Sequence, residues 1–206
     1  MSYKTEQEAF WAGEFGTDYI DRNQGDALLA SNIDFFSKAL RSTSGIKSCI
    51  EFGSNIGMNL KAIQLLYPSI DASAIEINKD AVKELSKVIS KEKIHNTSIL
   101  NFEPSTKYDL TLIKGVLIHI NPKELPSVYK KLVKSCGRYL MIAEYYNPSP
   151  VTITYRGHSD RLFKRDFAGE VMDLHSEFQL IDYGFVYHRA PSFPNDDITW
   201  FLLERK

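Results

Sequence analysis

The chain has 206 residues, of which 43% are hydrophobic, which is enough for one sizeable core and short for two domains. Although 25% of the residues are charged, the formal net charge is only −1. No global excess of positive charge would drive binding to a polyanion, so we expect no nucleic-acid partner. The two cysteines, Cys49 and Cys136, lack metal-ligand spacing and are expected to be reduced, idle thiols.

The amino terminus carries no pattern for export or membrane insertion. Residues 1–8 are polar and acidic, and no apolar core of a signal peptide follows them. No stretch approaches the roughly 18 to 20 apolar residues that a membrane span requires. We therefore expect a soluble, cytoplasmic protein without a membrane partner, and the sequence leaves its oligomeric state open.

The first part of the chain predicts a helical arm. Residues 10–16 are aromatic and contain two glycines, which is typical of a short helix or an ordered arm. The first clear helix is expected over residues 26–40, because Leu29, Ile33, Phe36 and Leu40 form one apolar stripe.

From Lys47 onward, strand and helix patterns alternate. Five strands are expected, at residues 48–52, 71–75, 97–100, 109–113 and 139–143. Leu60, Ile63 and Leu66 indicate the helix after the first strand. After the second strand, Asn78 is expected to cap a helix whose apolar side carries Val82, Leu85 and Val88.

The helix before the fifth strand has the clearest end signals. Asn121 is expected to cap it, with Pro122 in its first turn and Glu124 three residues after the cap. Gly137 is expected to end it. Its buried face is expected to consist of Leu125, Val128, Tyr129, Leu132 and Val133.

The carboxyl-terminal part has a different pattern. Residues 180–186 and 198–203 are expected to be strands joined by a proline-containing loop without a helix, which requires an antiparallel pair at a sheet edge. Strands separated by helices imply right-handed crossovers and a parallel sheet covered on both faces. The sequence therefore predicts an α/β fold: a single Rossmann-like domain with a mostly parallel seven-stranded sheet and an antiparallel C-terminal hairpin.

Residues Glu51 to Gly57 join the first strand to its helix and carry the strongest functional signal. Gly53 can adopt backbone angles forbidden to other residues and lets a ligand approach the main chain. Ligands of open α/β sheets bind at the carboxyl ends of the strands, where amides at a helix start can receive an anionic group. The alternative interpretation is an ordinary strand-to-helix turn.

Glu76, at the end of the second strand, adds a carboxylate at the same sheet edge. It could accept hydrogen bonds from both hydroxyls of a ribose, and charge-assisted bonds of this kind contribute on the order of 1.5 to 3 kcal/mol. The alternative is an exposed surface acid. A dinucleotide fingerprint needs glycines at its first, third and sixth positions, but here these are Gly53, Asn55 and Met58, which argues against a nicotinamide cofactor.

The loop resembles the acidic-x-Gly-x-Gly-x-Gly motif of class I S-adenosylmethionine (SAM)-dependent methyltransferases, with Asn55 in place of the middle glycine. Four longer strings resemble the pseudaminic acid biosynthesis-associated methylases, over about residues 10 to 203. They are FWAGEFG at 10–16, KGVLIHINP at 114–122, AEYYNP at 143–148 and YRGHSDRLF at 155–163.

This resemblance implies methylation of a nonulosonic, pseudaminic-acid-like sugar or its precursor in bacterial surface-glycan synthesis, with SAM as cofactor. It divides the chain into a helical lid or arm (1–44), a SAM-binding core (45–144), a substrate loop (145–163) and a C-terminal helix and strand pair (164–206). By the family pattern, Glu76 would hold the ribose. Ser98 and Ile99 would lie beside the adenine, although Ser98 replaces the usual acid and Asn101 could substitute for it. The remaining cofactor residues implied are Glu51, Gly53, Ser54, Asn55, Gly57, Ile77 and Lys114.

Polar aromatic residues and arginines after the fifth strand suit a sugar acid, because arginine binds carboxylates bidentately and tyrosine can bond hydroxyls. The alternative is a solvated loop whose tyrosines pack on the core. The expected substrate-binding residues are Tyr19, Arg22, Tyr145, Tyr155, Arg156 and Arg161.

The catalytic candidates are His119, His158 and Tyr146. With an unperturbed pKa near 6.5, a histidine could take a proton from a hydroxyl or amine, although histidines here are also often structural. Methyl transfer depends mainly on alignment, which can supply around 7 to 11 kcal/mol, so a strong general base is not required. Asp196 and Asp197 are expected to face water, and we expect no metal.

Two further functions remain open from the sequence. The chain could methylate another small acid or metabolite, or it could bind SAM as a scaffold without turnover.

Overall fold

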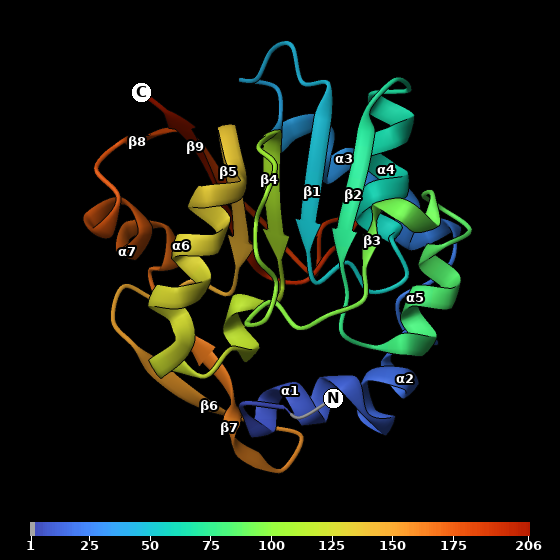
Figure 1. Cartoon of the computed structure of the whole chain (residues 1–206), viewed down its shortest axis with the longest axis vertical. Coiled ribbons are helices and arrows are strands. Elements are labelled where there is room, and N and C mark those ends of the chain that lie inside the picture. Colours follow the sequence, from blue (N-terminus) through green and yellow to red (C-terminus); the bar gives the residue numbers. More distant parts are fainter. Residues whose placement is uncertain (1–2) are drawn as a thin grey trace.

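We describe a computed structural model of the chain, which covers residues 3–206 and, for residues 158 and 159, only the backbone. Its main sheet has seven strands in the order β3-β2-β1-β4-β5-β9-β8 (Figure 1). The bounds are β1 (Ser48–Phe52), β2 (Asp71–Ile75), β3 (Ile94–His95), β4 (Tyr108–Lys114), β5 (Cys136–Glu144), β8 (Phe178–Val186) and β9 (Ile198–Arg205). The first five are parallel, whereas β9 runs antiparallel to both β5 and β8. This arrangement confirms the predicted fold class.

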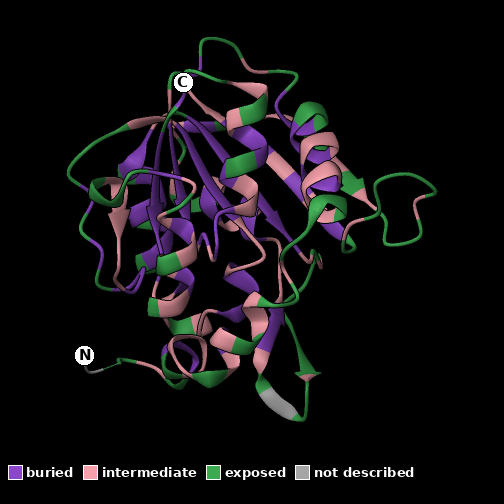
Figure 2. Cartoon of the chain, turned by 90° about the vertical axis from the view of Figure 1, so that its right-hand side faces the viewer, coloured by how far each residue is buried: buried purple, intermediate pink, exposed green. Residues whose placement is uncertain are grey.

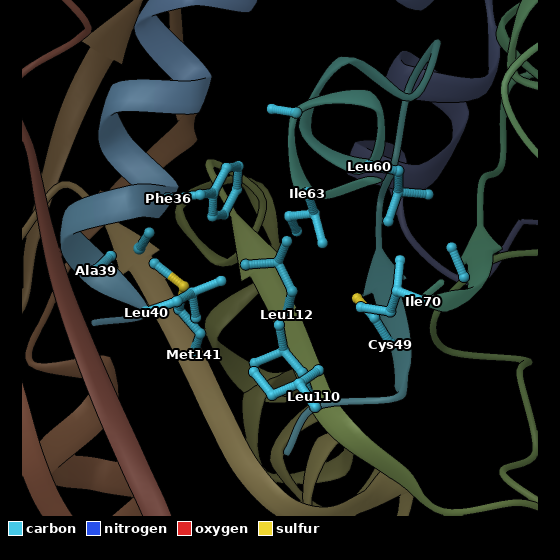
Figure 3. Close-up of a cluster of buried hydrophobic side chains, with 14 of the residues drawn as sticks. Phe36, Ala39, Leu40, Cys49, Leu60, Ile63, Ile70, Leu110, Leu112 and Met141 are labelled. Carbon is cyan, nitrogen blue, oxygen red and sulfur yellow. The ribbon is translucent and has the colours of Figure 1, made fainter. Parts of the chain in front are cut away.

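Helices cover both faces of the sheet because successive strand residues point to opposite sides. On β1, Cys49 belongs to one apolar cluster and Ile50 to the other. The first cluster packs under α3 (Asp26–Ala39) and α4 (Met58–Leu66), and Figure 3 shows Phe36, Leu60 and Ile63 meeting strand residues there. The second packs under α6 (Leu125–Ser135) and α7 (Phe167–Leu174). Figure 2 shows the strands buried between these layers.

Two predicted helices differ slightly in their ends. Asn78 caps α5 (Lys79–Leu85) by accepting from the amides of Asp80 and Ala81, but α5 ends before Val88. Asn121 caps a short 3-10 helix, η3 (Pro122–Glu124), which leads into α6. Gly137 does not end α6 as predicted. It lies inside β5, where an added Cβ would stand 2.9 Å from the carbonyl oxygen of Tyr108, so the glycine allows β5 to approach β4.

The strand predicted at residues 97–100 is wrong. The third strand is the shorter β3, and residues 97–100 form a turn in which the amide of Leu100 donates to Ser98 Oγ at 3.0 Å. Ile99 and Leu100 are buried, as the prediction assumed, but the turn rather than a strand buries them.

The arm and the predicted substrate loop both have regular structure. The arm contains α1 (Glu6–Ala12) and α2 (Glu14–Ile20), which lie across the carboxyl ends of the parallel strands (Figure 1). The predicted loop contains an antiparallel hairpin, β6 (Val151–Tyr155) and β7 (His158–Lys164), beside the arm. No helix in the described part of the chain is long and apolar enough to cross a membrane.

Candidate functional site

A cavity of about 710 Å³ is lined by residues at the carboxyl ends of the parallel strands and by residues of the arm. Its volume is in the range of about 300 to 1,000 Å³ that is typical of small-molecule sites. Its walls come from the segments that follow β1, β2 and β4, from the turn at residues 97–100, and from α1 and α2. The β6–β7 hairpin and the β8–β9 loop complete it. The cavity is therefore where the fold class places a ligand.

The loop after β1 is held in a left-handed conformation. Gly53, Asn55 and Gly57 have φ angles of 78°, 47° and 85°. A Cβ added at Gly53 would stand 2.7 Å from Val116 Cγ2, so this position requires glycine for space as well as for conformation. Asparagine is among the residues that best tolerate this conformation, which explains how Asn55 can occupy the position of a glycine.

Glu76 connects this loop to the end of β2. Its Oε2 accepts a hydrogen bond from the Asn55 amide, and its Oε1 accepts one from the Asn78 amide, each at 2.7 Å. The side chain is buried, and burial raises the pKa of its carboxyl, while the backbone amides oppose that rise. A carboxylate has about four lone-pair sites, so with the amides of Asn55, Asn78 and Ile77 acting on it the group still has acceptor capacity for a further donor.

Two buried carboxylates lie below the loop, outside the cavity lining. Glu51 Oε1 accepts from Asn59 Nδ2 at 2.7 Å, and Glu144 Oε1 accepts from the amides of Val116 and Leu117 at 3.0 and 2.9 Å. Neither residue's Oε2 has a hydrogen-bond partner among the described residues. Burial raises the pKa of both carboxyls to about 7, and the Lys114 ammonium lowers it in both cases. Burial in turn lowers the pKa of Lys114, which lines the cavity.

The raised pKa of Glu144 predicts a loss of stability with rising pH. The folded state keeps the proton up to about pH 7, whereas the unfolded chain releases it near pH 4.3. Between these values the native state binds more protons, so the free energy of unfolding falls as pH rises, by about 4 kcal/mol for this group.

Glu144→Gln should remove that contribution, so urea titrations at pH 5 and pH 8 should show the variant gaining stability relative to wild type at pH 8. Glu84→Gln, in the surface pair with Lys87, is the control and should follow the wild-type pH profile. An equal difference between variant and wild type at both pH values would contradict the prediction.

The turn at residues 97–100 closes one end of the cavity. Ser98 and Ile99 are buried there and line it together with Ile77. Ser98 Oγ donates to Glu8 Oε1 of α1, a contact that the sequence did not predict. Asn101, the predicted substitute for the missing acid, is exposed and does not line the cavity.

Five of the six predicted substrate residues, Tyr19, Arg22, Tyr145, Tyr155 and Arg156, line the cavity. Arg156 lies in the turn between β6 and β7, with its guanidinium 5.9 Å from the ring centre of Phe15 and 5.6 Å from that of Tyr155. Arg161 lies outside the lining. Its Nη2 lies 3.1 Å from Glu6 Oε2, so it holds α1 to the hairpin instead of reaching the cavity.

Of the three catalytic candidates, His119 is the one that the structure places at the cavity. Its Nδ1 lies 2.6 Å from the carbonyl oxygen of Arg161, which can only accept, so Nδ1 carries the hydrogen and Nε2 keeps a lone pair. Burial lowers the pKa of His119 to about 4, and the ring is therefore neutral near pH 7. Tyr146 lies outside the lining, against Phe201, and the His158 side chain is outside the described residues.

The β8–β9 loop contributes cavity residues that the sequence did not suggest. Asp196, expected to face water, lines the cavity near Tyr145. Burial, with the Asp196 carboxylate beside it, raises the pKa of the Tyr145 hydroxyl. Both aspartates are exposed, as expected, but Asp197 is not in the lining, and its Oδ1 lies 2.8 Å from His188 Nδ1. Among the described residues, no group of three or more histidine, cysteine or acidic side chains could hold a metal.

No family model matches the sequence, and no curated protein matches it. Solved structures do match. A SAM-dependent methyltransferase from Leishmania major has a TM-score of 0.70 at 15% identity, over 98% of this chain and 82% of that one. The mitomycin 7-O-methyltransferase has a TM-score of 0.69 at 11% identity, over 98% of this chain, which spans 61% of that protein's length.

Magnesium protoporphyrin IX methyltransferase from Synechocystis, with bound SAM, matches over the full length of both chains, with a TM-score of 0.66 at 14% identity. Identities of this size bear on the fold alone. With its mostly parallel seven-stranded sheet and antiparallel edge, the chain has the fold of the SAM-dependent methyltransferases.

Proposed function

We propose that the chain binds SAM in this cavity and transfers its methyl group to a small molecule. The observation that carries the proposal is the pairing of the loop after β1 with Glu76. The amide of Asn55 in that left-handed loop donates to the carboxylate that ends β2, so both lie at one edge of one cavity. The methyltransferases of similar fold from Synechocystis and of plantazolicin were solved with SAM and with its demethylated product, S-adenosylhomocysteine (SAH).

The cavity residues fit the three parts of SAM. Asn55 lines the cavity, and its Oδ1 is buried without a partner among the described residues, so a turn of the side chain would present an unused acceptor to the ammonium group of the methionine part. The remaining acceptor capacity of the Glu76 carboxylate suits a ribose hydroxyl. Beyond Glu76, Ile77 and Ile99 provide apolar walls for a flat base. Ser54 and Lys114 also line the cavity, whereas Glu51 and Gly57 support the loop from outside it.

SAM, when bound, supplies an electrophilic methyl group on a sulfonium. The contribution of the chain is then to bind and align. His119 Nε2 can accept a hydrogen bond from the acceptor's hydroxyl or amine, but with a pKa of about 4 it is a weak base near pH 7. The two carboxyls with a pKa of about 7, Glu51 and Glu144, lie outside the cavity lining. Alignment of the acceptor within the enclosed cavity is therefore the main source of rate that this site offers.

For the acceptor we propose a nonulosonic, pseudaminic-acid-like sugar or its precursor. The support is the resemblance of the four sequence strings, together with Arg22 and Arg156, which are exposed at the cavity and suit a carboxylate. The hydroxyls of Tyr19, Tyr145 and Tyr155 would bond those of the sugar. Another small molecule with a carboxylate could pair with the same two arginines, and it is the alternative methyl acceptor.

Calorimetry with SAM, SAH and NAD tests the cofactor. Binding of SAM and SAH with no heat from NAD is expected, and a folded protein that binds neither SAM nor SAH would overturn the proposal. Incubation with labelled SAM and a panel of nonulosonates and nucleotide-sugar precursors, followed by mass spectrometry, tests the acceptor. A gain of one methyl only on an unrelated metabolite would exclude the sugar, and SAM binding without transfer to any acceptor would favour a scaffold.

Arg156→Ala is expected to raise the KM for a carboxylate-bearing acceptor about tenfold or more, because a charge-assisted bond is lost, while leaving the Kd for SAH nearly unchanged. Initial rates over a range of acceptor concentrations, with calorimetry for SAH, measure the two effects. Arg41→Ala, at an exposed arginine that pairs with Asp182, is the control. A collapse of SAH binding in a folded Arg156→Ala protein would refute the assignment.

A further inference from the structure

Helix α1 places a carboxylate at the end of the cavity that the turn at residues 97–100 closes. Glu8 is only 6% exposed although it belongs to the arm, and its side chain contributes to the cavity lining. It lies against the turn at residues 97–100, where its Oε1 accepts the hydrogen of Ser98 Oγ. Burial of a carboxylate is costly unless hydrogen bonds compensate it, so the partners of each oxygen matter.

The helix start uses only one of the two Glu8 oxygens. Oε2 accepts from the amides of Lys4 and Thr5, at 2.6 and 3.0 Å, and so completes a capping box with Thr5. Oε1 is not needed for the cap. It faces the turn, accepts the hydrogen of Ser98 Oγ there, and keeps a further lone pair. The capping box therefore fixes the position of the carboxylate through Oε2, and Oε1 can accept a hydrogen bond from a ligand in the cavity.

The turn itself contains no acid. Residues 97–100 are Thr, Ser, Ile and Leu, and Asn101 next to them is exposed and outside the cavity. If the ribose lies on Glu76 and the methionine part on the loop after β1, the base extends past Glu76 between Ile77 and Ile99. The edge of the base then reaches Ser98 and Glu8. An adenine edge carries an exocyclic amino group, which needs an acceptor.

We propose that Glu8 of α1 binds the exocyclic amino group of the adenine, so that the arm supplies the acid that the core lacks. This inference rests on the proposed binding of SAM. It makes α1 part of the cofactor site and gives the site a preference for an adenine over a base with oxygen at that position. A site with a buried acceptor discriminates strongly against a group that cannot donate to it.

The test compares SAH with S-inosylhomocysteine, in which an oxygen replaces the amino group, by calorimetry on three full-length proteins. Wild type should bind SAH about tenfold or more tightly than the inosine analogue. Glu8→Gln should lower the affinity for SAH by a similar factor. It should shift the preference toward the inosine analogue, because the glutamine amide can donate a hydrogen bond to the oxygen of that base. Glu14→Gln, at an exposed residue of the neighbouring helix α2, should keep the wild-type preference.

The ratio of the affinities for SAH and for the inosine analogue distinguishes a direct contact between Glu8 and the base from a purely structural role of Glu8. A Glu8 that only caps α1 would, when changed, weaken both ligands equally, and an unchanged ratio in the Glu8→Gln protein would overturn the inference. Melting temperatures of the three proteins show whether the capping box has been lost. If wild type binds neither ligand, the proposed function fails, whereas equal ratios in all three proteins refute only the role of Glu8.

Discussion

Glu76→Gln is expected to weaken SAH binding about a hundredfold, the largest effect of any single substitution that preserves side-chain size in this site. Both carboxylate oxygens already accept backbone amides, from Asn55 and Asn78. In glutamine an NH2 group replaces one of the two oxygens, and this donor must face one of the backbone N–H donors. The variant also has one acceptor fewer for the ribose. Calorimetry with SAH measures the loss, and circular dichroism shows whether the fold is retained.

Glu84→Gln is the matched control, because Glu84 is on the next helix and pairs with Lys87 at the surface. It should leave the Kd for SAH within about twofold of wild type. Wild-type affinity in a folded Glu76→Gln protein would show that the cofactor does not reach the end of β2.

Gly16→Ala is expected to detach the arm while leaving the core folded. An added Cβ would lie 1.9 Å from the carbonyl oxygen of Trp11 and 2.9 Å from Asn78 Nδ2, so the backbone of α1 must move away. The bonds that Asn78 makes to the carbonyl oxygens of Trp11 and Gly13 would be lost with this movement. Overpacking of this kind costs on the order of 1 to 3 kcal/mol, enough to open a short helix pair.

Hydrogen exchange should show faster exchange of the amides in α1 and α2, with α3 and α6 protected as in wild type. SAH binding should weaken at least about tenfold, since Glu8 and the cavity wall move with the arm. The control is Gly13→Ala, whose added Cβ would lie 3.1 Å from the Ala9 carbonyl oxygen and needs only a small adjustment. Unchanged exchange in the Gly16→Ala protein would show that the arm tolerates the methyl group.

The sequence predicted the central part of the fold because the signals there are local. The strands 48–52 and 71–75 are apolar runs with clear ends, and the structure has them with the same bounds. The loop at Gly53 and the carboxylate at Glu76 follow directly from those ends. The hairpin of β6 and β7 was missed, although Val151 and Ile153 alternate with threonines as in a strand.

The sequence could not predict contacts between segments that lie far apart in the chain. Glu8 and Ser98 are 90 residues apart in the chain, and nothing in the local pattern around either residue indicates the other. For the same reason Asp196 and Asp197, adjacent in the sequence, could not be distinguished, although one lines the cavity and the other binds His188. Arg161 was expected to face the substrate because its charge suits a carboxylate, but it pairs with Asp160 beside it and with Glu6 of the arm.

Helix α1 contacts both ends of the cavity at once. Glu8 holds the turn after β3, while Gln7 Nε2 donates to the carbonyl oxygen of Asp160 in the hairpin at 2.9 Å. A molecule at either end is thus retained by the same seven-residue helix. We therefore expect that nucleoside product and methylated product leave after a single opening event, so that the frequency of this event sets an upper limit on turnover however fast the methyl group moves.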